Sequence, residues 1–461
     1  MDEPLTPEAP MTTLIDELLT RYAEHLDTRA IVLRKDAIAE GVRQMQAHLP
    51  EGTWLVAFDE NTWEVAGKAL AAELDRVGQA WERFEVMPPQ GEEVPRCDDA
   101  SIAAYQAALG EQDAVAGVAV GAGTINDIVK QACFNVDLYM ACVATSPSMN
   151  GYTSGIAAVL SEGVKTTIPC RAPRVVVADL DVLAESPYRM ICSGLGDLMS
   201  KPVSNADWQL SAWLNGTFHS AEAMVIIEAG AKLLDGVAPK LPSRDRQAVG
   251  DLTASLMLSG LAMSVAGSSS PASGGEHLIS HFIDMTSIAF DEPHDFHGCQ
   301  VGVGTLTTAY LYEQLMAMDP DTIDVEARVA ALKPWDDYAA LLNERFGPLY
   351  EAVVKHAEKA YPTADELRAR LTKLKSEWSV LRQKVGSTLR TCNSLEEELV
   401  EAKCPVRFAE LDVARERAWR SVAHSKDIRN RYTILHLAWE LGTLDAWTDK
   451  AIDRLYDSQI F

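Results

Sequence analysis

Residues 118–130 have the sequence VAVGAGTINDIVK, in which an apolar run ends in Gly121-Ala122-Gly123 and an amphipathic segment begins near Thr124. Glycines allow a backbone to approach a pyrophosphate closely, and the first turn of a new helix presents N–H groups to it. The motif therefore predicts the phosphate-binding turn of a nucleotide-binding βα unit. A tight βα turn without a ligand has the same sequence pattern, so this motif alone leaves both interpretations open.

Apolar runs like the one before Gly121 recur between about residues 30 and 185. The runs that we expect to be strands are Ala30–Leu33, Thr53–Phe58, Ala114–Val120, Leu138–Ala144 and Val175–Ala178. Helix-like segments lie between them, such as Thr62–Val77 and Thr124–Ala132. Strands that alternate with helices predict a parallel sheet of the α/β class.

The strand pattern stops after about residue 186, and long helical stretches follow. They are Arg189–Trp213, Ala221–Leu234, Asp245–Ala266, His277–Met285 and Gly302–Met318. We therefore predict an α/β dinucleotide-binding domain over 1–185 and an all-helical metal- and substrate-binding domain over 186–461. Residues 320–420 form an extension of this second domain to which the sequence assigns no role, and its part 363–420 is rich in Lys, Glu, Arg and Leu.

Composition limits the classes of function. The 461 residues include 67 acidic and 41 basic side chains, giving a net charge of −26. Such a chain repels nucleic acid and anionic membranes, and any phosphate site must be built locally. The eight cysteines form no CxxC pair, and the N-terminus has no basic targeting segment. We expect a cytoplasmic protein with no nucleic-acid partner and no membrane insertion.

Two polar segments follow other predicted strands. Asp59 ends the run LVAFD and is a candidate for the carboxylate that holds an adenosine ribose, with a helix N-cap as the alternative. The hydroxyl-rich segment ATSPSMNGYTS, residues 144–154, follows the fourth strand. It either lines a cofactor or substrate or is a simple Pro/Gly/Ser turn.

Histidines cluster later in the chain. His277 and His281 lie four residues apart, on one face of a predicted helix, and His297 follows about twenty residues later. Imidazoles suit Zn²⁺, Ni²⁺ or Fe²⁺, and a catalytic metal site needs about three protein ligands. Asp197, in GLGDLMSK, is a candidate for a further ligand. Lys201 is one helical turn away, either facing a substrate phosphate or lying on the surface.

A nucleotide site together with a His/Asp metal site indicates a reaction. A metal would lower the pKa of an alcohol oxygen bound to it, and a nicotinamide would accept the hydride.

Six segments in order resemble the glycerol-1-phosphate dehydrogenase group of the iron-containing alcohol dehydrogenase and dehydroquinate synthase-like superfamily. They are GAGTINDIVK, TSPSMNGYTS, VVVADLDVL, GLGDLMSK, SGGEHLISH and HGCQVGVGTL. The resemblance covers roughly residues 25–320, and DIRNRYTILHLAWELG at 427–442 is similar to the group's terminal helix. It implies an active site in a cleft between the two domains, NAD or NADP as cofactor, and one divalent metal, usually Zn²⁺, with Ni²⁺ or Fe²⁺ in relatives.

The resemblance also implies roles for individual residues. The metal ligands become Asp197, His277 and His297, and His281 becomes a substrate contact and proton-relay residue. The residues implied to bind the cofactor are Gly121, Gly123, Thr124, Asp127, Thr145, Ser148 and Ser154.

The chain departs from the group at Asn150, where the usual motif SMDGY has an Asp beside the substrate. An amide keeps one acceptor, adds donors and removes a charge, so this position bears on the identity of the substrate. The activity expected is interconversion of a small polyol or polyol phosphate and its ketone, with glycerol 1-phosphate and dihydroxyacetone phosphate as the leading pair. The alternatives are a dehydroquinate synthase-like cyclase and a non-catalytic binding protein. We expect a homo-oligomer of undetermined size.

Overall fold

The computed structural model describes residues 11–161 and 164–456. Contacts between residues group the chain into two compact units. Unit 1 comprises Met1–Leu198 and Ala221–Ser269, and unit 2 comprises Met199–Ser220 and Ser270–Phe461. The sequence analysis placed a single boundary near residue 185, whereas each unit contains two separate stretches of chain.

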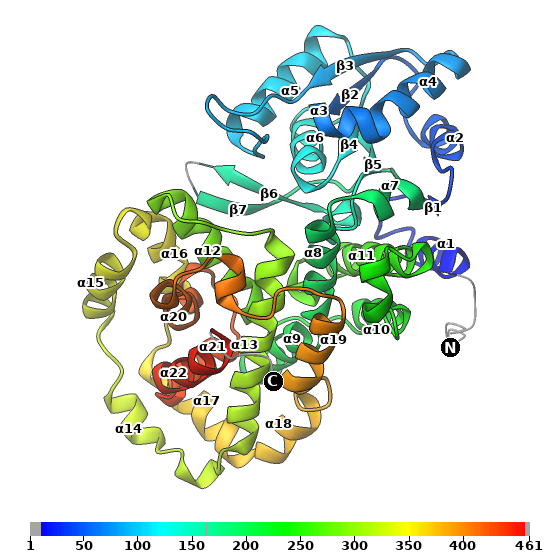
Figure 1. Ribbon diagram of the computed structural model, residues 1–461. Helices are drawn as coiled ribbons and strands as arrows, with labels where there is room; N and C mark the ends of the chain where they lie inside the picture. Colours follow the sequence, from blue (N-terminus) through cyan, green and yellow to red (C-terminus); the bar gives the residue numbers. More distant parts are fainter. Residues whose placement is uncertain (1–10, 162–163, 457–461) are drawn as a thin grey trace. The chain divides into compact units, whose positions relative to one another are not determined.

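A six-stranded parallel sheet forms the centre of unit 1 (Figure 1). In spatial order its strands are β1 (Ala30–Arg34), β8 (Val175–Asp179), β5 (Tyr139–Ala144), β4 (Ala116–Gly121), β2 (Trp54–Phe58) and β3 (Trp81–Glu85). The predicted α/β class and the five predicted strands are confirmed. The analysis missed β3, whose sequence WERFE is half exposed at the sheet edge and lacks an apolar run.

Helices pack against this sheet because their apolar faces meet its buried Val and Ala side chains. These helices include α2 (Ile38–His48), α4 (Lys68–Val77), α5 (Asp99–Glu111), α6 (Gly123–Asn135) and α7 (Leu180–Glu185). The segment predicted as one helix over Thr62–Val77 contains a π-helical turn at Trp63–Gly67 before α4. A Cβ at Gly67 would lie 2.5 Å from the Trp63 ring, so the close approach of that indole requires glycine.

Unit 1 also contains an antiparallel hairpin and further helices. The hairpin, β6 (Ile156–Ser161) with β7 (Val164–Pro169), was not predicted. The helices are α1 (Met11–Arg21), α8 (Tyr188–Met199), α10 (Ala221–Leu233) and α11 (Arg246–Ala266). By length and composition α11 is apolar enough to cross a membrane, but 83% of its most apolar window is buried within the structure, as in the core helix of a folded domain.

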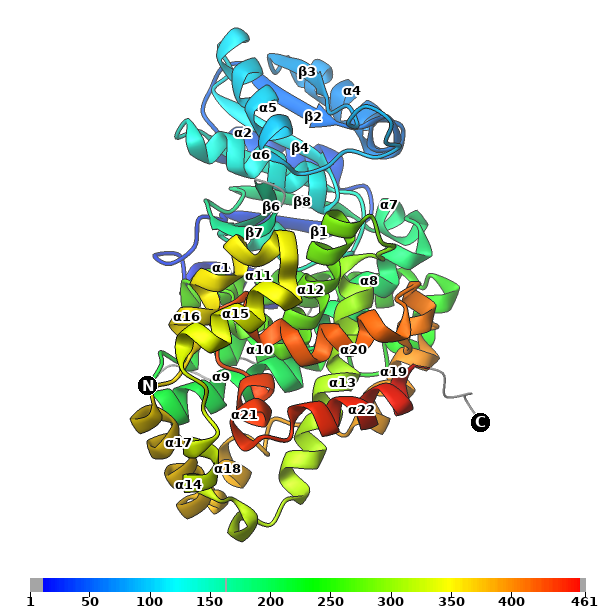
Figure 2. The ribbon, with the colours of Figure 1, turned by 90° about the vertical axis from the view of Figure 1, so that its left-hand side faces the viewer.

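Unit 2 is helical throughout its described residues. Its helices are α9 (Lys201–Asn215), α12 (Gly275–Phe290), α13 (His297–Ala317), α14 (Val325–Ala330), α15 (Trp335–Phe346), α16 (Tyr350–Ala360), α17 (Ala364–Ser376), α18 (Trp378–Lys384), α19 (Cys392–Glu401), α20 (Arg415–His424), α21 (Ile434–Leu441) and α22 (Leu444–Leu455). The long α13 contacts α12, α19, α21 and α22, and Figure 2 shows it beside α22. The predicted helical character of this region is confirmed.

The extension at 320–420 belongs to unit 2 and is joined to the C-terminal segment through Tyr338 of α15. The buried Tyr338 hydroxyl donates to the carboxylate of Asp427 at 2.9 Å and accepts from Lys426 Nζ at 2.6 Å. The Lys426 ammonium also lies 4.3 Å from the ring centroid of Trp439. A buried ion pair with these partners specifies how the extension docks onto the segment around residue 427.

Candidate functional site

The glycine turn of unit 1 has the geometry that its sequence predicts. Strand β4 ends at Gly121 and helix α6 begins at Gly123, with Ala122 as its N-cap in extended conformation. A Cβ at Gly121 would lie 2.7 Å from the Ile125 side chain, and one at Gly123 would lie 3.1 Å from Met149 Sδ. A side chain at Gly121 would clash, and one at Gly123 would displace Met149, so the turn favours glycine at both positions, as a pyrophosphate cradle does.

The segment after β5 is held tightly, which differs from a simple turn. Tyr152 donates through its hydroxyl to the Ser146 carbonyl at 2.8 Å, and Thr153 donates to the Met257 carbonyl at 2.6 Å. Two of the predicted cofactor contacts, Thr145 and Ser148, are buried here, and the Thr145 N–H donates to the Gly121 carbonyl at the end of β4. Ser154 is fully buried, with its hydroxyl 3.2 Å from the Gly151 carbonyl. Their contact with a nucleotide stays a prediction.

The two predicted cofactor carboxylates of unit 1 already have structural partners. Asp59 caps the N-terminus of a short helix, accepting from Thr62 N at 2.8 Å, which is the alternative role considered for it. Asp127 accepts from Ala158 N at 2.9 Å and lies 3.2 Å from Lys130 Nζ. The Lys130 ammonium is buried and also donates to the Gly151 carbonyl. Asp127 therefore stabilises the chain at Ala158 and pairs with the buried Lys130. Its contact with a cofactor stays a prediction.

Asn150 lies against Asp197 within unit 1. Its backbone N–H donates to Asp197 Oδ2 at 3.1 Å, and its side-chain Nδ2 donates to Asp197 Oδ1 at 3.3 Å. The same Nδ2 is 3.4 Å from Ser259 Oγ. Sequence analysis placed position 150 beside the substrate. The structure shows that its amide binds the side chain predicted to be a metal ligand, where an Asp would set two carboxylates against each other.

Helix α8 carries Asp197 to this position through a very close approach. A Cβ at Gly194 would lie 1.8 Å from the Pro147 carbonyl oxygen, so only glycine fits. The helix predicted over Arg189–Trp213 is in fact two helices, because α8 ends at Met199 and α9 starts at Lys201. Pro202 explains the break, since proline lacks the N–H and its ring clashes with the preceding turn.

Three imidazoles converge in unit 2. His277 and His281 lie on α12, and His297 is the first residue of α13. The His297 ring centroid is 5.2 Å from that of His277 and 5.3 Å from that of His281. The structure thus brings together the three histidines that the sequence singled out, of which His277 is buried and the other two are half-buried.

Lys201 is buried rather than on the surface, so the surface alternative is wrong. Its side chain is part of the core at 6% exposure, and Nζ donates to the Ala272 carbonyl at 3.4 Å and to Ser200 Oγ at 3.2 Å. The Ala272 carbonyl precedes α12 by a few residues, so the ammonium lies near the start of the helix that carries His277.

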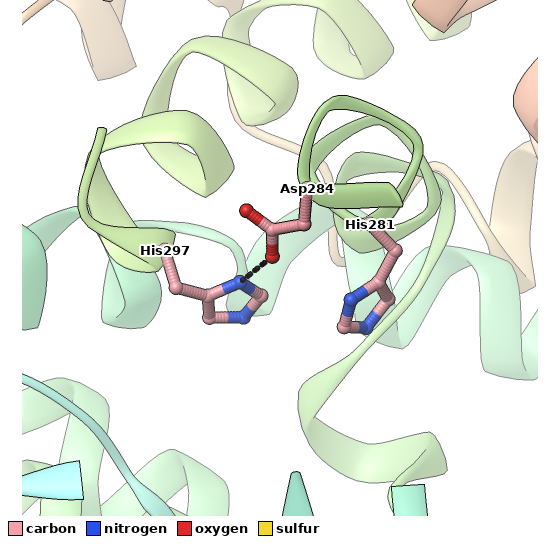
Figure 3. A group of neighbouring side chains, drawn as sticks. All are labelled: His281, Asp284 and His297. Atoms are coloured by element: carbon pink, nitrogen blue, oxygen red, sulfur yellow. Dashed lines mark ion pairs between the residues drawn. The ribbon is translucent and has the colours of Figure 1, made fainter. Parts of the chain in front are cut away.

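Side chains that the sequence analysis missed surround the imidazoles. Asp284 of α12 forms a group with His281 and His297 whose ligand atoms all lie within 4.8 Å of one another (Figure 3). Glu276, Ser280 and Gln300 make hydrogen bonds to the histidines or to Asp284. The spacing of Ser280 and Asp284 to His277, three and seven residues on a helix, was the available signal.

Comparison with known sequences gives the family. A sequence model of the iron-containing alcohol dehydrogenase family matches residues 33–187. The chain is 30% identical over 391 residues to the glycerol-1-phosphate dehydrogenase (NAD(P)+) of Bacillus subtilis, covering 85% of this chain and 86% of that one. It is 32% identical over 294 residues to the enzyme of the same name from Pyrococcus furiosus, covering 62% and 78%.

Solved structures agree on the fold. A probable glycerol dehydrogenase from Sinorhizobium meliloti superposes with a TM-score of 0.59 at 16% identity, covering 92% of this chain and 98% of that one. Glycerol dehydrogenase from Schizosaccharomyces pombe superposes with a TM-score of 0.57 at 16% identity, covering 93% and 91%. The sequence relatives show the family, and the solved structures agree on the fold. This chain therefore belongs to the glycerol-1-phosphate dehydrogenase group of the iron-containing alcohol dehydrogenase family.

Proposed function

We propose that this protein is a metal-dependent NAD(P)H oxidoreductase that interconverts a polyol phosphate and its ketone, with glycerol 1-phosphate and dihydroxyacetone phosphate as the leading pair. The observation that carries the proposal is the convergence of His277, His281 and His297 in unit 2 of a chain from this family. In the reductive direction, ketone, NAD(P)H and a proton give alcohol and NAD(P)+.

Asp197, His277 and His297 would hold one divalent cation, with Zn²⁺ preferred and Ni²⁺ or Fe²⁺ as alternatives. Two imidazoles and a carboxylate are a donor set that suits these ions and leaves positions for substrate. When bound, such a cation polarises the carbonyl oxygen of the ketone. His281, whose ring stacks on His297 and is half-buried, would deliver the proton to the developing alkoxide oxygen.

NAD or NADP would supply the hydride and bind along unit 1. The backbone N–H groups that follow Gly123 at the start of α6 would hold its diphosphate. A Cβ at Gly123 would contact Met149, so glycine suits the close approach of backbone at this turn. The hydroxyls of Thr145, Ser148 and Ser154 and the carboxylate of Asp59 would line the rest of the nucleotide.

The substrate phosphate needs positive charge in a chain whose net charge is −26. Lys201 would supply it, since its buried ammonium donates to the Ala272 carbonyl, which lies just before the start of α12. A buried ammonium interacts with a phosphate more strongly than a solvated one because less water screens the charge.

The test is NADH oxidation with dihydroxyacetone phosphate, combined with elemental analysis of the full chain. We expect turnover by the wild type, and loss of both bound metal and turnover in His277→Ala. His356→Ala, a half-buried histidine of α16 in the same unit, is the matched control and should retain both.

Three results would contradict the proposal. Phosphate release without net NADH consumption would indicate the cyclase, and neither activity would indicate a binding protein. Wild-type metal content in His277→Ala would remove that residue from the ligand set. The preference between NAD and NADP, the cytoplasmic location and the homo-oligomeric state stay predictions.

A further inference from the structure

Both imidazoles of the proposed ligand set are hydrogen-bonded through Nδ1 to side chains of unit 2. We propose that Glu276 and the pair Ser280–Gln300 are positioning residues that hold His277 and His297 with the proton on Nδ1, so that both Nε2 lone pairs are available to the cation. This inference rests on the proposed function. A metal binds only the unprotonated ring nitrogen, and the partner of the other nitrogen decides which one that is.

The bond to His277 fixes its tautomer directly. Glu276 Oε1 lies 2.8 Å from His277 Nδ1 and also accepts from Gly274 N at 2.7 Å. An ionised carboxylate only accepts hydrogen bonds, so Nδ1 must be the donor. Glu276 is fully buried. His277 Nε2 is then the ring nitrogen without a proton, the form in which an imidazole binds a metal.

The tautomer of His297 follows from a chain of three hydrogen bonds. Gln300 Nε2 donates to the Asp295 carbonyl at 2.7 Å and to Asp284 Oδ1 at 3.1 Å. Both partners are acceptors, which fixes the orientation of the amide and leaves Gln300 Oε1 to accept from Ser280 Oγ at 3.1 Å. The single hydroxyl proton of Ser280 is thereby used. Ser280 Oγ must accept at its other contact, 2.9 Å from His297 Nδ1, so this nitrogen carries a proton.

This assignment excludes one way of using a second candidate ligand set, in which His297 would bind a cation through Nδ1. His281, Asp284 and His297 lie close enough to hold a cation by themselves, and Asp284 Oδ2 is 3.8 Å from His297 Nδ1 (Figure 3). Figure 3 shows that carboxylate facing the Nδ1 side of the His297 ring. Since Nδ1 is protonated, a cation cannot use it, and Asp284 serves as the acceptor that orients Gln300.

The first test measures Zn²⁺ affinity of the full-length metal-free protein by competition with a chromogenic chelator. Ser280→Ala removes the acceptor for His297 Nδ1–H with almost no change in volume, and we expect its dissociation constant to rise roughly 10- to 100-fold. Ser421→Ala is the matched control, since Ser421 is fully buried in α20 of the same unit and donates only to the Ala418 carbonyl. Its affinity should equal that of the wild type.

The second test reads the tautomers directly. In protein labelled with ¹⁵N-histidine and free of metal, the imidazole resonances of His277 and His297 should have the pattern of a protonated Nδ1. Glu276→Gln keeps an acceptor oxygen for His277 and should lose less Zn²⁺ affinity than Glu276→Ala.

The outcomes distinguish failure of this inference from failure of the proposed function on which it rests. If the wild type binds Zn²⁺ but Ser280→Ala binds as tightly as Ser421→Ala, the positioning role is overturned and the proposed function stands. A protonated Nε2 on either histidine also overturns it. If the wild type binds no divalent cation, the proposed function fails and this inference fails with it.

Discussion

Replacing Asn150 by Asp should destabilise the metal-free protein far more than the metal-loaded protein. Asn150 donates to both carboxylate oxygens of Asp197, at 3.1 Å from its backbone and 3.3 Å from its side chain. The substitution removes the side-chain donor and places a second negative charge at that separation. A divalent cation held by Asp197 would neutralise the new charge and restore the stability.

The expected size follows from this geometry. Two unit charges 3.3 Å apart repel by about 5 kcal/mol at an effective dielectric of 20 and by about 1 kcal/mol in bulk water. Asn150 is half-buried, so the repulsion falls between these limits. Loss of a hydrogen bond to a charged group adds about 1.5–3 kcal/mol. The sum of the two terms gives an expected loss of roughly 2.5–8 kcal/mol in the free energy of unfolding. For a chain of 461 residues, each kcal/mol lowers the unfolding temperature by roughly 1 °C.

The assay is thermal unfolding at pH 8, first with EDTA and then with excess Zn²⁺. Asn150→Ala removes the side-chain hydrogen bond without adding charge, and Asn343→Asp adds a charge on the exposed face of α15. Asn150→Asp should be the least stable of the three in EDTA and should recover most on addition of Zn²⁺.

Two results would refute the reasoning. If Asn150→Asp is as stable as Asn343→Asp in EDTA, position 150 does not contact Asp197. If Zn²⁺ leaves the difference unchanged, Asp197 is not a ligand. The same variant also tests substrate choice, since an unchanged ranking of substrates by kcat/KM would show that position 150 does not set specificity.

Three further predictions concern the scaffold and the cofactor. Gly194→Ala should lower the free energy of unfolding by at least about 3 kcal/mol, because its Cβ would lie 1.8 Å from the Pro147 carbonyl oxygen. The control Gly110→Ala, whose Cβ would meet nothing within 4 Å, should be neutral or stabilising, and urea titration compares the two variants. Gly123→Val should reduce NADH affinity at least about tenfold while bound metal is retained, measured by fluorescence titration, and unchanged affinity would move the nucleotide site elsewhere. Burial raises the pKa of Glu440 from 4.5 to about 7, so its contribution to stability is complete below pH 4.5 and is lost as the pH rises through 7. Glu440→Gln should remove up to about 3 kcal/mol of this pH dependence in urea titrations at pH 5 and pH 8, and an unchanged slope would contradict the shift.

Much of the sheet could be predicted because its central strands are buried on both faces. Strands β2, β4, β5 and β8 therefore consist of nearly continuous apolar runs, rich in Val and Ala, that need no tertiary information to recognise. Strands β3 (WERFE) and β7 (VKTTIP) were not predicted, because a partly exposed strand carries charged or mixed residues like those of loops. Strand β6 (IAAVLS) is apolar and was not predicted either.

Some features of the candidate site are set by local sequence, and others are set only by tertiary packing. The glycine turn and the spacing of His277 and His281 are local, since one turn of chain or helix sets their geometry, and the sequence alone was enough to find them. Other features depend on elements that are separate in the chain. They are the burial of Lys201, the contact of Asn150 with Asp197 and the hydrogen bond between Ser280 and His297. Only packing of the helices decides these contacts, because a hydrogen bond forms within about 3 Å and the sequence contains no distance between separate elements.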